Sequence, residues 1–307
     1  MSTSHTRRDA VKLMGAAAVG ATLPIPSGAR RLPSRSAAEE DLRGLFVILS
    51  TPYTESGAVD YDDLAFQVEW LEHAGVHGLV WPQNSSDYPR LTEDEIRRGM
   101  ETLEPDMMIA MPPKVGSSLE DYRAYYTALA RVTSRPVMMQ TQPNLAGVEF
   151  ETDFILELAE RFPHLGYVKE EAQPVFDRIS ALVGQAPIQR VYSAMRGRYF
   201  AYDLRLGVDG LVSGMSMYAD VFARMWDAYR ADDWDDVRDI HGRLLVMLTC
   251  EQSIPGAGRY LLHRRGIFRT RRQRGSDVRL SPVQIDEIEH NLRGLEPYLV
   301  DVPNRQA

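Results

Sequence analysis

Lysine is scarce in this chain. Of its 35 cationic side chains only Lys12, Lys114 and Lys169 are lysines, and all the others are arginines. Either residue can serve as a surface charge, but arginine does not give up its proton in proteins. An amine that must be neutral in order to react therefore has to be one of these three lysines.

Other absences exclude several classes of function. Cys250 is the only cysteine, so an intrachain disulfide is impossible. The net charge of −8 argues against a nucleic-acid partner, and no glycine-rich phosphate-binding motif indicates a nucleotide. His73 and His77 are separated by Gly75 and have no third ligand nearby, which argues against a metal site. We expect no cofactor.

Long hydrophobic runs are also lacking. The longest candidate, Leu13 to Leu23, is too short to span a bilayer, and it follows the paired arginines Arg7 and Arg8. This layout resembles a twin-arginine export signal. We therefore predict a signal and linker at 1–35, an extracytoplasmic location and one domain at 36–307; the alternative is a disordered cytosolic leader.

Short apolar runs alternate with helical patterns through the rest of the chain. The continuous hydrophobicity of the runs is typical of strands buried on both faces of a parallel sheet. Strands are predicted at 43–50, 76–82, 106–111, 136–141, 165–169, 189–193 and 210–213. Helices are predicted at 60–74, 92–103, 119–132, 151–162, 175–183 and 199–206, followed by helices at 218–231, 234–249, 256–262 and 282–295. This rhythm predicts a TIM-type (β/α) barrel with C-terminal helices and only seven strands.

Lys169 ends one of these strands, where the sequence changes from apolar Tyr167 and Val168 to ionisable Glu170 and Glu171. In a (β/α) barrel the reactive groups lie on the loops that follow the strands. Strand alternation turns Glu171 toward the side of Lys169 and Glu170 away from it. Lys169 is therefore either a reactive amine or the cation of a structural ion pair.

The ordered motifs of the chain resemble the dihydrodipicolinate synthase/N-acetylneuraminate lyase family. They are Thr-Pro-Tyr at 51–53, Leu-Thr-Glu-Asp-Glu at 91–95, Pro-Val-Met-Met at 136–139, Gly-Tyr-Val-Lys-Glu at 166–170 and Gly-Val-Asp-Gly-Leu-Val-Ser-Gly at 207–214. The resemblance implies a barrel that is usually oligomeric. It also implies that Lys169 forms a Schiff base with a small 2-oxo acid.

The chain departs from the family pattern at the predicted site. Gln-Asn-Ser-Ser-Asp at 83–87 replaces the usual carboxylate-binding loop, and Gln140 replaces a proton-relaying tyrosine. Leu145 replaces an arginine that grips a second carboxylate, and 113–114 replaces an aromatic pair. These replacements argue against lysine biosynthesis and against sialic acid cleavage. The family's further strand and helix are missing between Leu103 and Asp106, so the barrel either closes with seven strands, is distorted or open there, or is a shortened version.

The resulting hypothesis is a Schiff-base lyase of aldolase type acting on a small 2-oxo acid. The catalytic candidates are Lys169, Gln140 and Lys114, and the substrate-binding candidates are Thr51, Asn84, Ser85, Glu171 and Ser213. Tyr53, Asp87, Lys114 or a water held by Ser85 and Gln140 could transfer protons. The alternatives are an exported barrel that binds a ligand without turnover, and a Schiff-base dehydratase.

Two charged stretches have structural interpretations. The basic run at 263–275 is predicted to be a solvated loop or a subunit contact. The aspartates around Trp234 are predicted to form a helix-capping turn rather than a calcium site.

Overall fold

Seven parallel strands form one sheet in the computed structural model, which describes residues 42–103, 108–112, 118–142, 148, 150–276 and 278–305. The strands are β1 (Gly44–Ile48), β2 (Gly78–Val80), β3 (Met108–Ala110), β4 (Val137–Gln140), β5 (Tyr167–Lys169), β6 (Arg190–Ser193) and β7 (Gly210–Ser213). The predicted export signal at 1–35, Lys114 and Leu145 lie outside the described residues.

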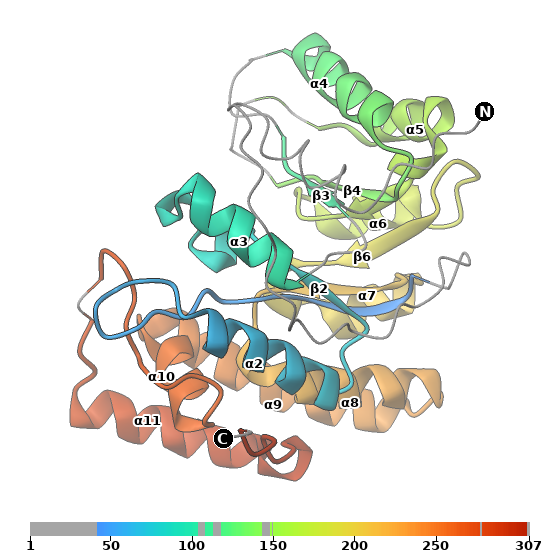
Figure 1. Ribbon diagram of the computed structural model, residues 1–307. Coiled ribbons are helices and arrows are strands. Elements are labelled where there is room, and N and C mark those ends of the chain that lie inside the picture. The colour runs from blue at the N-terminus through green and yellow to red at the C-terminus, as the bar shows by residue number, and fades with distance from the viewer. Residues whose placement is uncertain are drawn as a thin grey trace.

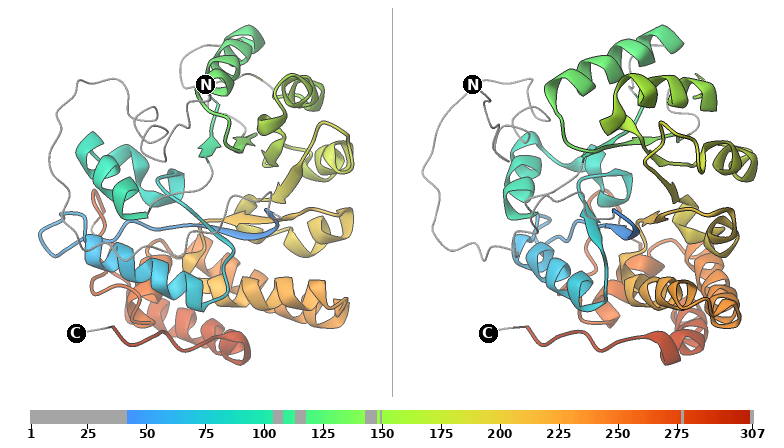
Figure 2. Two further views of the ribbon diagram at one scale, coloured as in Figure 1. Left: turned by 45° about the vertical axis from the view of Figure 1, so that its right-hand side comes forward. Right: turned by 90° about the vertical axis from the view of Figure 1, so that its right-hand side faces the viewer.

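Helices surround this sheet, as both views of Figure 2 show. They are α2 (Tyr61–His73), α3 (Glu93–Leu103), α4 (Leu119–Val132), α5 (Thr152–Arg161), α6 (Val175–Leu182), α7 (Phe200–Leu206), α8 (Ala219–Arg230), α9 (Trp234–Ser253), α10 (Ala257–Arg264) and α11 (Pro282–Leu292). In Figure 1, α4 and α5 lie at one end of the molecule and α8, α9 and α11 at the other. No helix in the described part of the chain is long and apolar enough to cross a membrane.

The strands are continuously apolar because both of their faces are buried. Alternate residues such as Phe46, Met138 and Tyr192 form a small core inside the curved sheet. The residues between them, such as Val47 and Val191, pack against the surrounding helices in the main core. This two-sided burial explains why the hydrophobic runs do not alternate.

The strand order is β2-β1-β7-β6-β5-β4-β3, so β2 and β3 are the two ends of the sheet. Among the described residues no strand pairs with their outer edges. The barrel is therefore nearly closed, with its gap between β2 and β3. This confirms the seven-strand prediction, and the gap lies where the sequence lacks one β/α unit relative to the family pattern.

The basic run after α10 binds the chain's own carboxylates. Arg265 pairs with Asp220 at 2.6 Å, with side chains only 6% and 1% exposed. Arg269 bonds to Asp63 at 2.7 Å, and Arg274 to Glu95 at 2.5 Å. The solvated-loop interpretation is wrong for Arg265, whose side chain is buried, whereas that of Arg269 is half exposed. All three arginines bond to carboxylates of this chain, and a subunit contact by the rest of the run stays a prediction.

The aspartates before α9 do cap a helix. The Asp233 carboxylate accepts a hydrogen bond from the backbone N–H of Asp236 at 3.0 Å. An aspartate at this position satisfies one of the free N–H groups of the first turn. The capping prediction is confirmed.

Candidate active site

Lys169 is the last residue of β5 and projects into the interior of the barrel. Its register partners are Gln140 on β4 and Tyr192 on β6, and Tyr192 belongs to the inner core. Only 3% of Lys169 is exposed. The amine therefore lies at the carboxyl ends of the strands, the end at which (β/α) barrels place their reactive groups.

Glu171 lies beside the amine, at 3.2 Å from its Oε1 to Lys169 Nζ. Burial lowers the pKa of Lys169, and the charge of Glu171 opposes that shift. Desolvation favours the neutral amine, whereas the neighbouring carboxylate favours the ammonium. The amine therefore lies in a buried position with one carboxylate as its ion-pair partner.

Glu170 points to the other face of the strand, as the alternation predicted. Its Oε1 accepts hydrogen bonds from Arg178 Nε at 3.0 Å and Thr141 Oγ1 at 2.5 Å. Burial raises the pKa of Glu170, and Arg178 opposes that rise. This pair fixes β5 to α6 from behind, so only one of the two glutamates shares the lysine's side.

A chain of side-chain amides extends from Glu171 to the loop after β2. Gln140 Nε2 donates to Glu171 Oε2 at 2.6 Å, and Gln140 Oε1 accepts from Gln83 Nε2 at 2.7 Å. Gln142 Oε1 accepts from Gln140 at 3.2 Å and from Asn84 Nδ2 at 2.8 Å. The structure thus brings together three predicted residues, Gln140, Glu171 and Asn84.

Gln83 and Gln142 were missed as site residues by the sequence reasoning. Each directly adjoins a predicted candidate, Asn84 or Gln140, and that adjacency at a strand end was the only available signal. The Gln83–Gln140 bond also joins the loop after β2 to β4, across the gap in the sheet. This bond connects the two sides of the gap, across which the described residues form no strand pairing.

The remaining candidates lie around this cluster. Ser85 is exposed, and its side chain lies against Gly214, where a Cβ would come within 2.4 Å of Ser85 Oγ. The Thr51 hydroxyl is fully buried between the Ser86 carbonyl and the Trp81 indole. Ser213 Oγ accepts from the backbone N–H of Met215 at 3.2 Å. Thr51 and Ser213 hold loops of the site here, and substrate contact by them stays a prediction.

Tyr53 and Asp87 belong to a second polar cluster after β1 and β2. The Tyr53 ring lies under the guanidinium groups of Arg259 and Arg274, at 5.5 and 4.8 Å. Arg259 Nη2 lies 3.6 Å from Asp87 Oδ2 and donates to the Thr51 carbonyl at 2.5 Å. Burial, with a smaller effect from Asp87, raises the pKa of Tyr53 to about 12. Tyr53 is therefore poorly suited to exchange protons near neutral pH.

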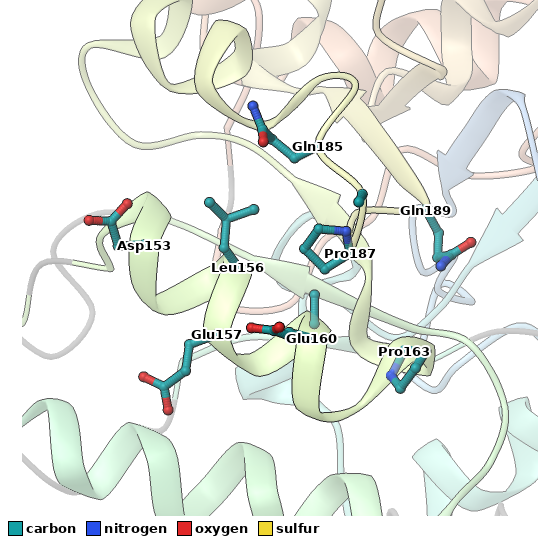
Figure 3. A pocket seen from close by; sticks show the side chains of 10 residues that line it. Asp153, Leu156, Glu157, Glu160, Pro163, Gln185, Pro187 and Gln189 are labelled. Atoms are coloured by element: carbon teal, nitrogen blue, oxygen red, sulfur yellow. The ribbon is translucent and has the colours of Figure 1, made fainter.

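The groove shown in Figure 3 lies at the opposite end of the barrel. It is lined by residues of α5, such as Asp153 and Glu157, and by Pro163, Pro187 and Gln189. Pro163 and Gln189 precede β5 and β6, so they mark the amino ends of the strands. The groove is remote in the fold from the lysine end. No cluster of metal-ligating side chains occurs among the residues described.

Fold and site together define a (β/α) barrel protein with a buried lysine at a strand end. The chain belongs to the dihydrodipicolinate synthetase family, whose model matches residues 91–274, more than half of the sequence. This confirms the resemblance inferred from the motifs.

Similar curated proteins carry two kinds of name. A 4-hydroxy-tetrahydrodipicolinate synthase of Parabacteroides distasonis is 25% identical over 66% of this chain and 80% of its own. A 4-hydroxy-tetrahydrodipicolinate synthase of Stenotrophomonas maltophilia is 23% identical over 81% of this chain and 93% of its own. An L-2-keto-3-deoxyarabonate dehydratase of Azospirillum brasilense is 21% identical over 84% and 96%.

Solved structures share the fold. The dihydrodipicolinate synthase of Rhodopseudomonas palustris superposes with a TM-score of 0.73 at 17% identity, over 83% of this chain and 98% of that one. The Thermotoga maritima dihydrodipicolinate synthase gives 0.72 at 17% identity, over 82% and 98%. At such identities the likeness shows the fold alone.

Proposed function

We propose that this protein is a Schiff-base lyase that acts on a small 2-oxo acid through Lys169. The observation that carries the proposal is the buried Lys169 amine at the carboxyl end of β5, with an ionisable partner 3.2 Å away. A lysine amine condenses with a ketone to give an iminium. The iminium withdraws electrons and so allows a neighbouring C–C or C–O bond to break or form.

The surroundings of Lys169 argue against lysine biosynthesis as the particular reaction. By the family resemblance, Gln140 stands where the synthases carry their relay tyrosine, and Gln140 bonds instead to Glu171. Amides have both donors and acceptors, so Asn84 and Gln142 are suited to a substrate with hydroxyl groups rather than a second carboxylate. We therefore place the substrate among hydroxylated 2-oxo acids.

A dehydratase is the second candidate. The relative named L-2-keto-3-deoxyarabonate dehydratase aligns over 84% of this chain and 96% of its own length. Elimination of water from a 2-oxo acid and aldol cleavage can both start from the same iminium. A group that accepts and returns a proton beside the lysine serves either reaction.

Borohydride trapping tests the proposal. The protein is incubated with pyruvate and with hydroxylated 2-oxo acids, reduced, and weighed intact by mass spectrometry. We expect one covalent adduct per chain, absent in Lys169→Ala. Product analysis with the acid that traps fastest then separates aldol cleavage from loss of water. If no 2-oxo acid gives an adduct, the result would favour a binding protein without turnover.

A further inference from the structure

We infer that Glu171 is the proton-transfer group of the Schiff-base reaction. It would take the role of the tyrosine that, by the family resemblance, Gln140 replaces. The inference rests on the proposed function and assigns a second catalytic residue to the same site. Glu171 presents one oxygen to each neighbour: Oε1 lies 3.2 Å from Lys169 Nζ, and Oε2 accepts from Gln140 Nε2 at 2.6 Å. Its carboxyl group is therefore held against the reacting nitrogen.

The other ionisable groups near Lys169 in the described part of the chain are engaged elsewhere. Glu170 lies on the opposite face of β5, bonded to Arg178 and Thr141. Tyr192, the register partner on β6, donates its hydroxyl to the Leu42 carbonyl at 2.5 Å. Gln140, the register partner on β4, cannot titrate. Among the described residues, Glu171 is the ionisable side chain paired with the amine.

Partial exposure also distinguishes Glu171 from its neighbours. Its side chain is 13% exposed, against 4% for Lys169 and 0% for Glu170. A carboxyl group that only neutralises a buried amine could be fully enclosed. One that must deliver a proton to a substrate oxygen has to reach the space that the substrate enters.

The proton balance closes within the Lys169–Glu171 pair. Transfer of one proton from the ammonium to the carboxylate leaves a neutral amine and a carboxylic acid. The amine nitrogen attacks the ketone carbon and forms the C–N bond, while Glu171 protonates the carbonyl oxygen. Glu171 then removes a proton from nitrogen and returns it to the hydroxyl, which leaves as water. The products are a protonated iminium and a carboxylate, so no proton is needed from solvent.

Gln140 acts as a positioning residue in this scheme. Its amide N–H fixes Glu171 Oε2, and its carbonyl oxygen is itself held by Gln83 Nε2 at 2.7 Å. An amide in this place can orient the carboxyl group without competing for the proton. In this scheme Glu171 supplies the ionisable group that Gln140 does not.

The test is the rate of adduct formation with pyruvate in excess borohydride, measured on the full protein as a function of pH. A glutamate that only stabilises the ammonium slows the reaction, so Glu171→Gln would then trap faster than the wild type. A proton-transferring glutamate speeds the reaction. We expect Glu171→Gln to trap about 100-fold more slowly and to lose the limb of the pH profile that belongs to the carboxyl group.

Three further variants keep the result interpretable. Glu171→Asp retains a carboxyl group at shorter reach, and we expect slower trapping with the pH limb still present. Acetate is expected to restore part of the rate in Glu171→Ala. Glu160→Gln makes the same chemical change on the remote α5 surface of Figure 3 and should behave as the wild type.

The outcomes separate this inference from the proposed function. If the wild type traps and Glu171→Gln traps as fast or faster, with no acetate rescue in Glu171→Ala, Glu171 is not the proton-transfer group and the Schiff base stands. If the wild type forms no adduct with any 2-oxo acid, the proposed function fails and this inference fails with it. If Glu171→Gln does not fold, the pH profile of Glu171→Asp decides. Slower trapping with the pH limb still present supports the inference, and trapping as fast as in the wild type contradicts it.

Discussion

The chemistry of Lys169 depends on its pairing with Glu171. Burial lowers the pKa of the Lys169 amine, and the charge of Glu171 opposes that shift. At 3.2 Å the two effects oppose each other, and the proton can move between nitrogen and oxygen. The ion-pair interpretation and the catalytic interpretation thus describe the same contact, and only chemistry at the nitrogen distinguishes them.

Arginine at position 169 separates charge from chemistry. Lys169→Arg can keep a cation opposite Glu171, but a guanidinium does not lose its proton to become a nucleophile. We expect turnover to fall by at least about 1000-fold while the protein remains folded. Turnover and thermal unfolding of the same preparation measure this. Substantial activity in the variant would exclude Lys169 as the nucleophile.

Asp203 gives the protein a second pH-dependent feature, away from the lysine. It is 1% exposed on α7 and accepts from Ser193 Oγ at 2.5 Å, and burial raises its pKa from 3.8 to about 6. A raised folded-state pKa stabilises the protein below the unfolded value, and this contribution is lost as the pH rises through the folded value.

The consequence can be measured with Asp203→Asn, which cannot ionise. Relative to this variant, the wild type should lose on the order of 2 kcal/mol of unfolding free energy between about pH 4 and pH 7. Denaturant titrations at several pH values measure the difference. A constant difference across this range would contradict the assignment.

Among the elements, β5 is held from both faces. Glu170 and Arg178 fix it from the helix side at 3.0 Å, and the amide chain through Gln140 and Gln83 approaches it from the interior. The second connection crosses from β4 to the loop after β2, past the open edges of the sheet. This connection supplies part of the constraint that an eighth strand would provide.

Removal of this amide connection should loosen the gap. Gln83→Ala and Gln140→Ala each leave a buried amide partner unsatisfied, which costs roughly 1–3 kcal/mol. We expect the double variant to lose less than the sum, by about 0.5 kcal/mol or more, because both single changes break the same Gln83–Gln140 bond. Equilibrium unfolding measures this, with exposed Gln185→Ala as the control. Strict additivity would show that the bond contributes nothing.

How far the sequence predicts these elements depends on the range of the contacts. Leu119–Val132 and Gly210–Ser213 have the predicted bounds because apolar spacing and turn residues define them locally. Strand alternation likewise placed Glu171, and not Glu170, beside Lys169. The Gln83–Gln140 bond joins residues 57 positions apart through the closure of the barrel, and no local pattern encodes that distance.

At the scale of the whole molecule, the C-terminal segment is bonded to α2. Asp63 on α2 is 1% exposed and accepts from Arg269 Nε at 2.7 Å and from Arg305 Nη1 at 2.6 Å. Arg305 also lies 4.1 Å over the Phe66 ring. The basic run had suggested an exposed surface because the sequence does not show which carboxylates will face it.

Asp63 should therefore be a stability determinant far from the site. Asp63→Ala leaves two arginines without their shared partner, and we expect a loss of about 2–4 kcal/mol, since Arg269 remains half exposed and screened. Asp62→Ala is the matched control, because that side chain is 88% exposed. Its effect should stay within about 0.5 kcal/mol. Equal effects of the two changes would contradict the account.

The scarcity of lysine makes the central claim directly measurable. Peptide mapping by tandem mass spectrometry after borohydride reduction with a 2-oxo acid can assign the adduct to one of three lysines, Lys12, Lys114 or Lys169. We predict that the added mass is found on the peptide containing Lys169 and on no other. An adduct on Lys114, or one that persists in Lys169→Ala, would contradict the assignment of Lys169 as the Schiff-base residue.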